Sequence, residues 1–396
     1  MTDYKWVRPD VDLYHLGTNL VSISNSENLS TSFYSYAVNF HDAASCTIEY
    51  LLGEACQKQD IAKLDLWYFA IIYLYRQSLE LLLKANIFQV VTSNADRKNI
   101  LGTIRHDLKQ AYEMLIDLKA LAVQDNENAT WLMEFLSDIS SIDRESDMFR
   151  YPFGNNLEPL FKKQTHISLV ATQSNMSRAF DSLKSIYFIN QFPEKTYSNY
   201  PAKLIVEGGS YYQQSVVGYK YPGKSFYPYY SSYEECGTFL KSIIISRKAP
   251  SLFVPMCYLF RNAVELGLKR LIIEDSHLTS ERALKIVRKK KHSIAGLWNS
   301  IEVEIQTHAN AQPEDTTLDD AKKYIEQFHN FDPHSDLFRY PCSKDIDIYF
   351  SEETVLDIEN IASCFEELCH FLDAVDSMLS ELKAHELEML SYYADY

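Results

Sequence analysis

Apolar residues recur at helical spacing along two stretches of the chain, and the same charged residues interrupt both. The first stretch reads LYRQSLELLLKANI (74–87), and the second reads LFRNAVELGLKRLI (259–272). Residues four positions apart lie on one face of a helix. The pattern therefore predicts two apolar helices that each carry one polar stripe. The stripes consist of Arg76, Glu80 and Lys84 in the first helix and of Arg261, Glu265 and Lys269 in the second.

Further helical patterns surround each stripe in the same order. A helix that begins Phe-Tyr-x-Tyr is expected before each stripe, from Phe33 and from Phe226. After the first stripe, Ser93 with Asp96 three residues later indicates the start of another helix. Apolar residues at helical spacing from Val355 onward predict a long last helix. The fold class is therefore predicted to be all-α.

Minor strand content is expected near the start of each unit and around the middle of the chain. Short extended pieces are predicted at HISLV (166–170) and IDIYF (346–350). The segment KLIVEGGSYY (203–212) is followed by SVVGYKY (215–221), and the glycine pair at 208–209 separates two β-prone runs. We expect these two runs to pair as a small hairpin.

Two more motifs follow each stripe. A basic residue precedes a histidine at 105–106 and again at 291–292, and the tracts SDMFRYP (146–152) and SDLFRYP (335–341) come next. Three landmarks in one order at nearly constant spacing predict an internal duplication. We expect one helical unit over residues 1–195 and a second over residues 196–396.

The charge of the chain is acidic, with one local exception. A formal net charge of −16 argues against the extended basic face that captures nucleic acid. The segment RALKIVRKKKH (282–292) nevertheless concentrates basic residues directly before His292. We interpret it as a candidate contact for a phosphate backbone. Its basic residues are Arg282, Lys285, Arg288, Lys289, Lys290 and Lys291.

Several features bear on location. The 7 cysteines include no Cys-x-x-Cys pair and no zinc-type spacing, which is typical of reduced thiols in a cytoplasm. The start of the chain, MTDYKWVRPD, lacks the apolar region of a signal peptide. The longest apolar tract is interrupted by the charges of the first stripe, so no membrane span is expected.

The repeated polar residues are candidates for chemistry. His106 and His292 can accept or donate a proton near neutral pH, which suits general acid and base catalysis. Arg150 and Arg339 have the geometry for bidentate contact with phosphate. Tyr151 and Tyr340, the residues that follow these arginines, can stack on a base. No further ligands at metal-binding spacing accompany the histidines, and GxxxxGK[ST] and GxGxxG are absent, so neither a metal nor a cofactor is expected.

A structural interpretation stands beside each of these roles. The stripe can be an ion-pair ladder within its helix, or its Arg and Glu can bridge to neighbouring helices and fix their register. Arg150 can likewise pair with an acid of its own unit, such as Asp143 or Asp147. The basic run can be a solvated face.

The order of these motifs resembles the HEPN superfamily of small helical bundles. The matching residues are Arg76, Glu80, Lys84, His106-Asp107-Leu108 and Arg150-Tyr151-Pro152, with Arg261, Glu265, Lys269, His292-Ser293-Ile294 and Arg339-Tyr340-Pro341 in the second copy. The resemblance covers about residues 35–190 and 225–385. HEPN ribonucleases typically carry Arg, a polar residue and then His a few residues beyond the Arg. That motif is not found in this chain.

The resemblance implies a prokaryotic protein that binds RNA or nucleotides in antiphage defence or a toxin–antitoxin system. The resemblance also implies a metal-independent endoribonuclease. It further implies that the two units pair within one chain as a pseudo-dimer, or that two chains form a homodimer. The histidines would then move the proton, and Arg150 and Arg339 would stabilise the phosphate. Two alternatives remain open. One is a non-catalytic protein-interaction or scaffold protein whose polar residues form a structural network, and the other is a small-molecule enzyme that uses the cleft between the units.

Overall fold

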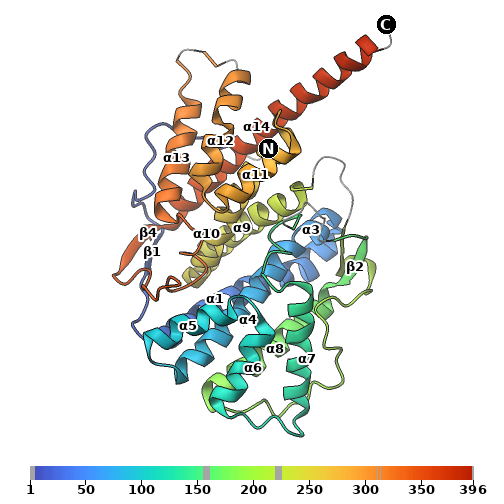
Figure 1. The fold of residues 1–396 in the computed structure, drawn as a ribbon, viewed down its shortest axis with the longest axis vertical. Helices are drawn as coiled ribbons and strands as arrows, with labels where there is room; N and C mark the ends of the chain where they lie inside the picture. Colours follow the sequence, from blue (N-terminus) through green and yellow to red (C-terminus); the bar gives the residue numbers. More distant parts are fainter. Residues whose placement is uncertain (1–4, 155–160, 219–224, 310, 313, 395–396) are drawn as a thin grey trace.

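A computed structural model describes residues 5–154, 161–218, 225–309, 311–312 and 314–394. Helices dominate it, and two small two-stranded sheets account for its strands (Figure 1). The prediction of an all-α fold is confirmed. The helices are α1 Leu29–Tyr50, α2 Cys56–Lys58, α3 Ile61–Leu66, α4 Tyr68–Val90, α5 Asn94–Ile104, α6 Leu108–Lys119, α7 Glu127–Ile142, α8 Leu169–Ile189, α9 Tyr227–Arg247, α10 Phe253–Arg270, α11 Ser280–Lys290, α12 Ile294–His308, α13 Thr317–Phe331 and α14 Ile358–Ala394. The strands are β1 Leu20–Ile23, β2 Thr165–Ser168, β3 Gln214–Val217 and β4 Thr354–Asp357.

Helices α4 and α10 are the two central elements. Every residue from Tyr68 to Phe88 of α4 is buried, and so is every residue of α10. A helix that is buried on all sides must be covered all round by other elements. Helices α1, α6 and α8 pack on α4, and helices α9, α12 and α14 pack on α10. The charged stripes recognised in the sequence are therefore enclosed within the molecule.

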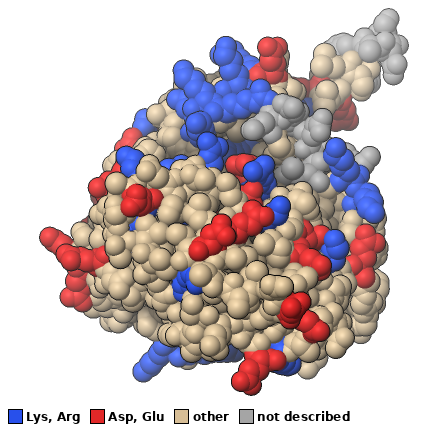
Figure 2. Space-filling view, turned by 60° about the horizontal axis from the view of Figure 1, so that its bottom comes forward, with Lys and Arg blue, Asp and Glu red and all other residues tan. Residues whose placement is uncertain are grey.

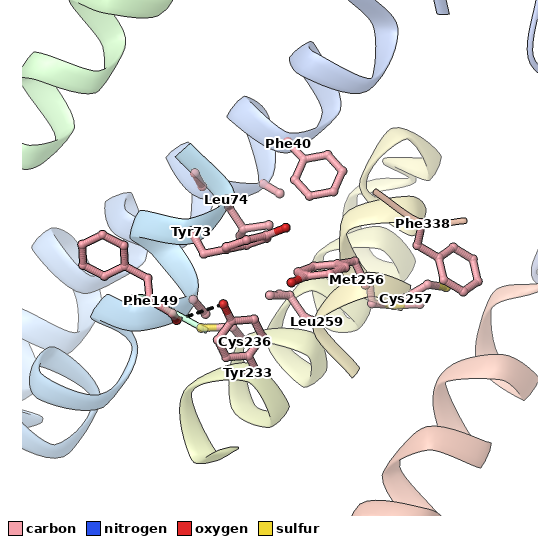
Figure 3. Close-up of a cluster of buried hydrophobic side chains, with 14 of the residues drawn as sticks. Phe40, Tyr73, Leu74, Phe149, Tyr233, Cys236, Met256, Cys257, Leu259 and Phe338 are labelled. Atoms are coloured by element: carbon pink, nitrogen blue, oxygen red, sulfur yellow. Dashed lines mark hydrogen bonds between the residues drawn. The ribbon is translucent and has the colours of Figure 1, made fainter. Parts of the chain in front are cut away.

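Aromatic residues join the two central helices. The rings of Tyr73 on α4 and Tyr258 on α10 stack with their centroids 4.8 Å apart. Figure 3 shows the surrounding cluster, to which α1, α4, α9 and α10 all contribute. The Tyr233 hydroxyl on α9 donates to the backbone carbonyl of Phe149 at 3.0 Å. One apolar core thus runs through both halves of the chain.

Both sheets join segments that are far apart in the sequence. Strand β1 pairs antiparallel with β4, and β2 pairs antiparallel with β3. Ion pairs also hold the chain start against α14, where Lys5 lies 2.6 Å from Glu366. Both strand pairings therefore join a segment before residue 195 to a segment after it. The division into units at that point stays a prediction.

Two of the strand predictions were wrong, although the one at HISLV is confirmed by β2. The runs beside Gly208 and Gly209 do not form a hairpin, because β3 pairs with β2 and Glu207 bridges to Ile167 of β2. Residues 219–221 of the second run lie outside the described part of the chain. The second extended piece is β4 at 354–357 instead of IDIYF, so Val355 belongs to a strand and the last helix begins at Ile358.

Within the described residues, no helix is long and apolar enough to cross a membrane.

Candidate functional site

Glu80 is the centre of a polar cluster in the N-terminal half. Its carboxylate accepts from Arg76 at 3.0 Å, from Lys84 at 2.6 Å and from the Tyr340 hydroxyl at 2.8 Å, and it lies 3.1 Å from Nδ1 of His106. The Glu80 side chain is only 3% exposed. Burial alone would raise the pKa of this carboxyl, but Lys84, His106 and Arg76 hold the pKa well below its usual range. Glu80 is therefore a buried anion that four side chains satisfy.

Glu265 is the centre of an equivalent cluster in the C-terminal half. It accepts from Lys269 at 2.6 Å, from Arg261 at 3.4 Å and from the Tyr151 hydroxyl at 2.7 Å, and it lies 3.0 Å from Nδ1 of His292. Burial opposes ionisation here as well, yet Lys269, His292 and Arg261 hold the pKa of Glu265 well below its usual range. The same residue types therefore meet in the same roles at both places.

The two halves exchange their tyrosines. Tyr340 follows Arg339 in the C-terminal half but donates to Glu80, and Tyr151 follows Arg150 in the N-terminal half but donates to Glu265. Burial and the neighbouring glutamate raise the pKa of both phenols well above the usual range. Each cluster is therefore completed by a residue from the other half.

Lysine contacts strengthen this exchange. The Lys84 ammonium lies 4.6 Å from the centroid of the Tyr340 ring, and the Lys269 ammonium lies 4.2 Å from that of Tyr151. A cation at such a distance from an aromatic face is attracted by the ring. Both tyrosine rings thus pack within the protein in the conformation described, and stacking on a base stays a prediction.

Arg76 fixes the turn that carries His106. Its guanidinium donates to the His106 carbonyl at 2.7 Å and to the Asp143 carbonyl at 3.1 Å, and Nε lies 3.1 Å from the Asp143 carboxylate. Arg261 donates to the His292 carbonyl at 2.7 Å in the same way. The stripe arginines therefore bridge between helices, as one of the structural interpretations predicts.

Asp143 and Asp332 are residues of these clusters that the sequence did not single out as site residues. Each carboxylate accepts hydrogen bonds from two backbone N–H groups of the Ser-Asp tract that follows it. For Asp143 the donors are Asp147 and Met148. Burial raises the pKa of Asp332 although Arg261 opposes this shift. The available signal was the recurrence of an aspartate four residues before the aspartate of each tract.

Arg150 and Arg339 are enclosed, at 3% and 4% exposure. Arg150 donates to the Ser146 carbonyl at 2.6 Å and to the Asp147 carboxylate at 2.7 Å. Its guanidinium lies 5.9 Å from the Tyr73 ring centroid, and that of Arg339 lies 5.9 Å from the Tyr258 ring centroid. Of the two acids considered as partners for Arg150, Asp147 is the one that it contacts, and Asp143 pairs with Arg76.

The histidines are the most exposed members of the two clusters. The side chains of His106 and His292 are 24% and 36% exposed, whereas those of Glu80 and Glu265 are 3% and 0% exposed. Since Nδ1 faces a carboxylate, it carries the proton, and Nε2 is left as an acceptor. Within the described chain, no partner is recorded for Nε2 of either histidine. Burial lowers the pKa of His106, with further contributions from Arg339 and Lys84, against the raising effect of Glu80.

Removal of the Tyr340 hydroxyl should raise the pKa of His106. The Tyr340→Phe variant removes one donor from the Glu80 carboxylate, which then interacts more strongly with the protonated imidazole. NMR titration of the His106 ring signals would measure this. The matched control is Tyr151→Phe, which removes a donor from Glu265 and should leave the pKa of His106 unchanged. Equal shifts of His106 in the two variants would contradict the exchange.

The basic run is helix α11 together with Lys291. Arg282, Lys285, Arg288, Lys289 and Lys291 are exposed, and Lys290 is half-buried. Figure 2 shows Lys and Arg gathered in one region, at the same end of the molecule as the protruding end of α14. Elsewhere on this face, acidic and basic residues are mixed with uncharged ones.

No three His, Cys, Asp or Glu side chains in the described ranges are grouped so that they could hold a metal ion. No protein-family model, no curated protein and no solved structure matches the chain.

Proposed function

We propose that the protein is a HEPN-like protein that binds RNA and cleaves it without a metal ion. The observation that carries the proposal is that His106 and His292, which are partly exposed, pair through Nδ1 with buried ionised glutamates. A carboxylate at Nδ1 fixes the tautomer in which Nε2 accepts a proton. Nucleotide binding at the same histidines is the minimal form of the proposal.

The chemistry that suits such a histidine is transfer within RNA. Nε2 takes the proton of a ribose 2′-hydroxyl, and the 2′ oxygen forms a bond to the adjacent phosphorus. The bond from phosphorus to the 5′ oxygen breaks, that oxygen takes a proton from water, and Nε2 later returns its proton to water. The products are a 2′,3′-cyclic phosphate and a free 5′-hydroxyl, and neither a metal nor a cofactor is required.

Arg150 and Arg339 were predicted to stabilise the phosphate in this reaction. Their enclosed positions assign them a structural part in the conformation described, where they hold the tyrosine tracts. They would reach a phosphate only if those tracts moved. Lys291, the exposed cation that directly precedes His292, is the better candidate for the first contact.

The equivalent contacts around Glu80 and Glu265 support an origin by duplication. They also support an internal pseudo-dimer, because each half supplies a tyrosine to the other. We place the boundary between the two units at residue 195 and the protein in the cytoplasm of a prokaryote, in antiphage defence or a toxin–antitoxin system. These assignments rest on the resemblance and on the repeated motifs.

A second candidate is a non-catalytic protein that binds another protein. The burial and mutual satisfaction of Arg76, Glu80, Lys84 and Tyr340 favour it, since such a network stabilises a fold without any reaction. Under this alternative the histidines are peripheral members of the network, and the acidic and aromatic surface carries the function.

The distinguishing experiment is a cleavage and binding assay with the purified chain on a mixed cellular RNA pool, with and without EDTA. His106→Ala, His292→Ala and the double variant are compared with His385→Ala, an exposed histidine of α14. We expect EDTA-resistant cleavage that the double variant loses and His385→Ala keeps. Binding without cleavage would reduce the proposal to its minimal form. Neither binding nor cleavage would favour the protein-interaction alternative.

A further inference from the structure

Helix α11 presents cations that the protein itself does not use. Within the described residues, no ion pair or hydrogen bond is recorded for the side chains of Arg282, Lys285, Lys289, Lys290 and Lys291. At a rise of about 1.5 Å per residue, the run from 282 to 291 extends over roughly 13 Å. One phosphate group cannot contact cations over that length, whereas a chain of phosphates can.

The corresponding helix of the N-terminal half, α5, lacks such a surface. Arg97 is 8% exposed, and its guanidinium donates to the Val91 carbonyl at 2.8 Å and lies 5.1 Å from the Phe88 ring centroid. Lys98 lies 2.5 Å from the Asp345 carboxylate. Arg97 is thus buried, Lys98 is exposed but pairs with an acidic residue, and Arg105 is the exposed cation next to His106.

The basic run of α11 leads directly to His292. Lys291 adopts a left-handed backbone conformation with φ of 51°, and His292 follows it with its Nδ1 at 3.0 Å from Glu265. Arg105 has the same place before His106, with φ of 44°. The two turns therefore match in backbone conformation and differ in the charge that precedes them.

We propose that RNA enters the protein along α11, and that the two clusters differ in use because only the His292 cluster adjoins a binding surface for several consecutive phosphates. This inference rests on the proposed function, since it names the cluster that takes the substrate. The ligand is single-stranded RNA held by its phosphate backbone. Binding releases counterions from the RNA, and because this release is less favourable at high salt, the affinity falls as the salt concentration rises. The overall charge of −16 argues against an extended basic surface that would bind RNA without a local site.

The test is the affinity of a short fluorescent single-stranded RNA, measured by anisotropy over a range of salt concentrations. Lys285→Glu/Lys289→Glu/Lys291→Glu should weaken binding at least tenfold and lower the slope of log affinity against log salt by about 2, the value for three lost phosphate contacts. A control with the same change in net charge is Lys184→Glu/Lys195→Glu/Lys344→Glu, whose lysines are also exposed. It should bind within about threefold of the wild type. The corresponding Lys→Ala triple on α11, which avoids new acidic pairs, should show the same ranking.

The single variants Lys291→Glu and Arg105→Glu form a matched pair, because both residues are exposed and directly precede a cluster histidine. We expect Lys291→Glu to weaken binding severalfold and Arg105→Glu to leave it nearly unchanged. Equal losses in the two variants, or unchanged binding by the α11 triple, would overturn the inference while the proposed function stands. Absence of RNA binding by the wild type would overturn both.

Discussion

Glu80→Ala should lower the free energy of unfolding by about 3–5 kcal/mol, the cost of leaving buried charges without their partner. Arg76 and Lys84 would lose a carboxylate that lies 3.0 Å and 2.6 Å away, and both side chains are nearly fully buried. His106 and Tyr340 would lose the same acceptor. Urea denaturation of the wild type and the variant, followed by circular dichroism, measures the difference.

A surface pair of the same kind gives the control. Lys58 lies 2.5 Å from Glu54 with the same spacing of four residues, but the two side chains are 65% and 54% exposed. Exposed pairs contribute little because water screens them. Glu54→Ala should therefore leave the urea midpoint almost unchanged. If Glu80→Ala also left it unchanged, the Glu80 cluster would not be a stabilising network.

The sequence pattern was sufficient to predict the helical class and the contents of each stripe. Four-residue spacing placed Arg76, Glu80 and Lys84 on one side of α4, because that spacing is a local property of a helix. It left open whether the stripe acts within its helix or between helices. The structure contains both, since Arg76 contacts Glu80 within α4 and also the His106 and Asp143 segments.

The exchange of Tyr151 and Tyr340 could not be predicted from spacing. Each tyrosine meets a glutamate that lies more than 100 positions away in the chain. Periodicity reports which side of an element faces the core and does not report which other element it meets. The hairpin prediction failed for the same reason, because β-prone runs beside Gly208 and Gly209 pair with β2, which is distant in the sequence.

A third cluster of charges lies between the end of α10 and α14. Asp275 and Asp376 are each 4% exposed. Arg270 forms ion pairs with Asp376 and, at 3.3 Å, with Asp373. One guanidinium cannot fully neutralise the two buried carboxylates of Asp275 and Asp376 while it also pairs with Asp373. Burial and the neighbouring Asp376 accordingly raise the pKa of Asp275 to about 8, and burial raises that of Glu274 to about 7.

The stability that Asp275→Asn gains over the wild type should therefore be larger at alkaline pH than at acidic pH. In the folded wild type Asp275 keeps its proton up to about pH 8, whereas in the unfolded chain it ionises near the usual pKa of about 4. The stability that this proton provides is complete below about pH 4 and is lost as the pH rises towards 8. Asparagine is neutral throughout, so the advantage of the variant should be smallest near pH 4 and largest near pH 8.

Comparison of the variant with the wild type at each pH is essential, because other groups act in the opposite direction. The lowered pKa of His106 makes a contribution that is complete above the unfolded pKa and is lost as the pH falls. That contribution is common to both proteins and cancels in the difference. Asp181→Asn on the exposed face of α8 is the matched control and should show no such trend. A constant difference between Asp275→Asn and the wild type from pH 4 to 8 would mean that Asp275 is ionised in the folded protein and that Arg270 neutralises the whole cluster.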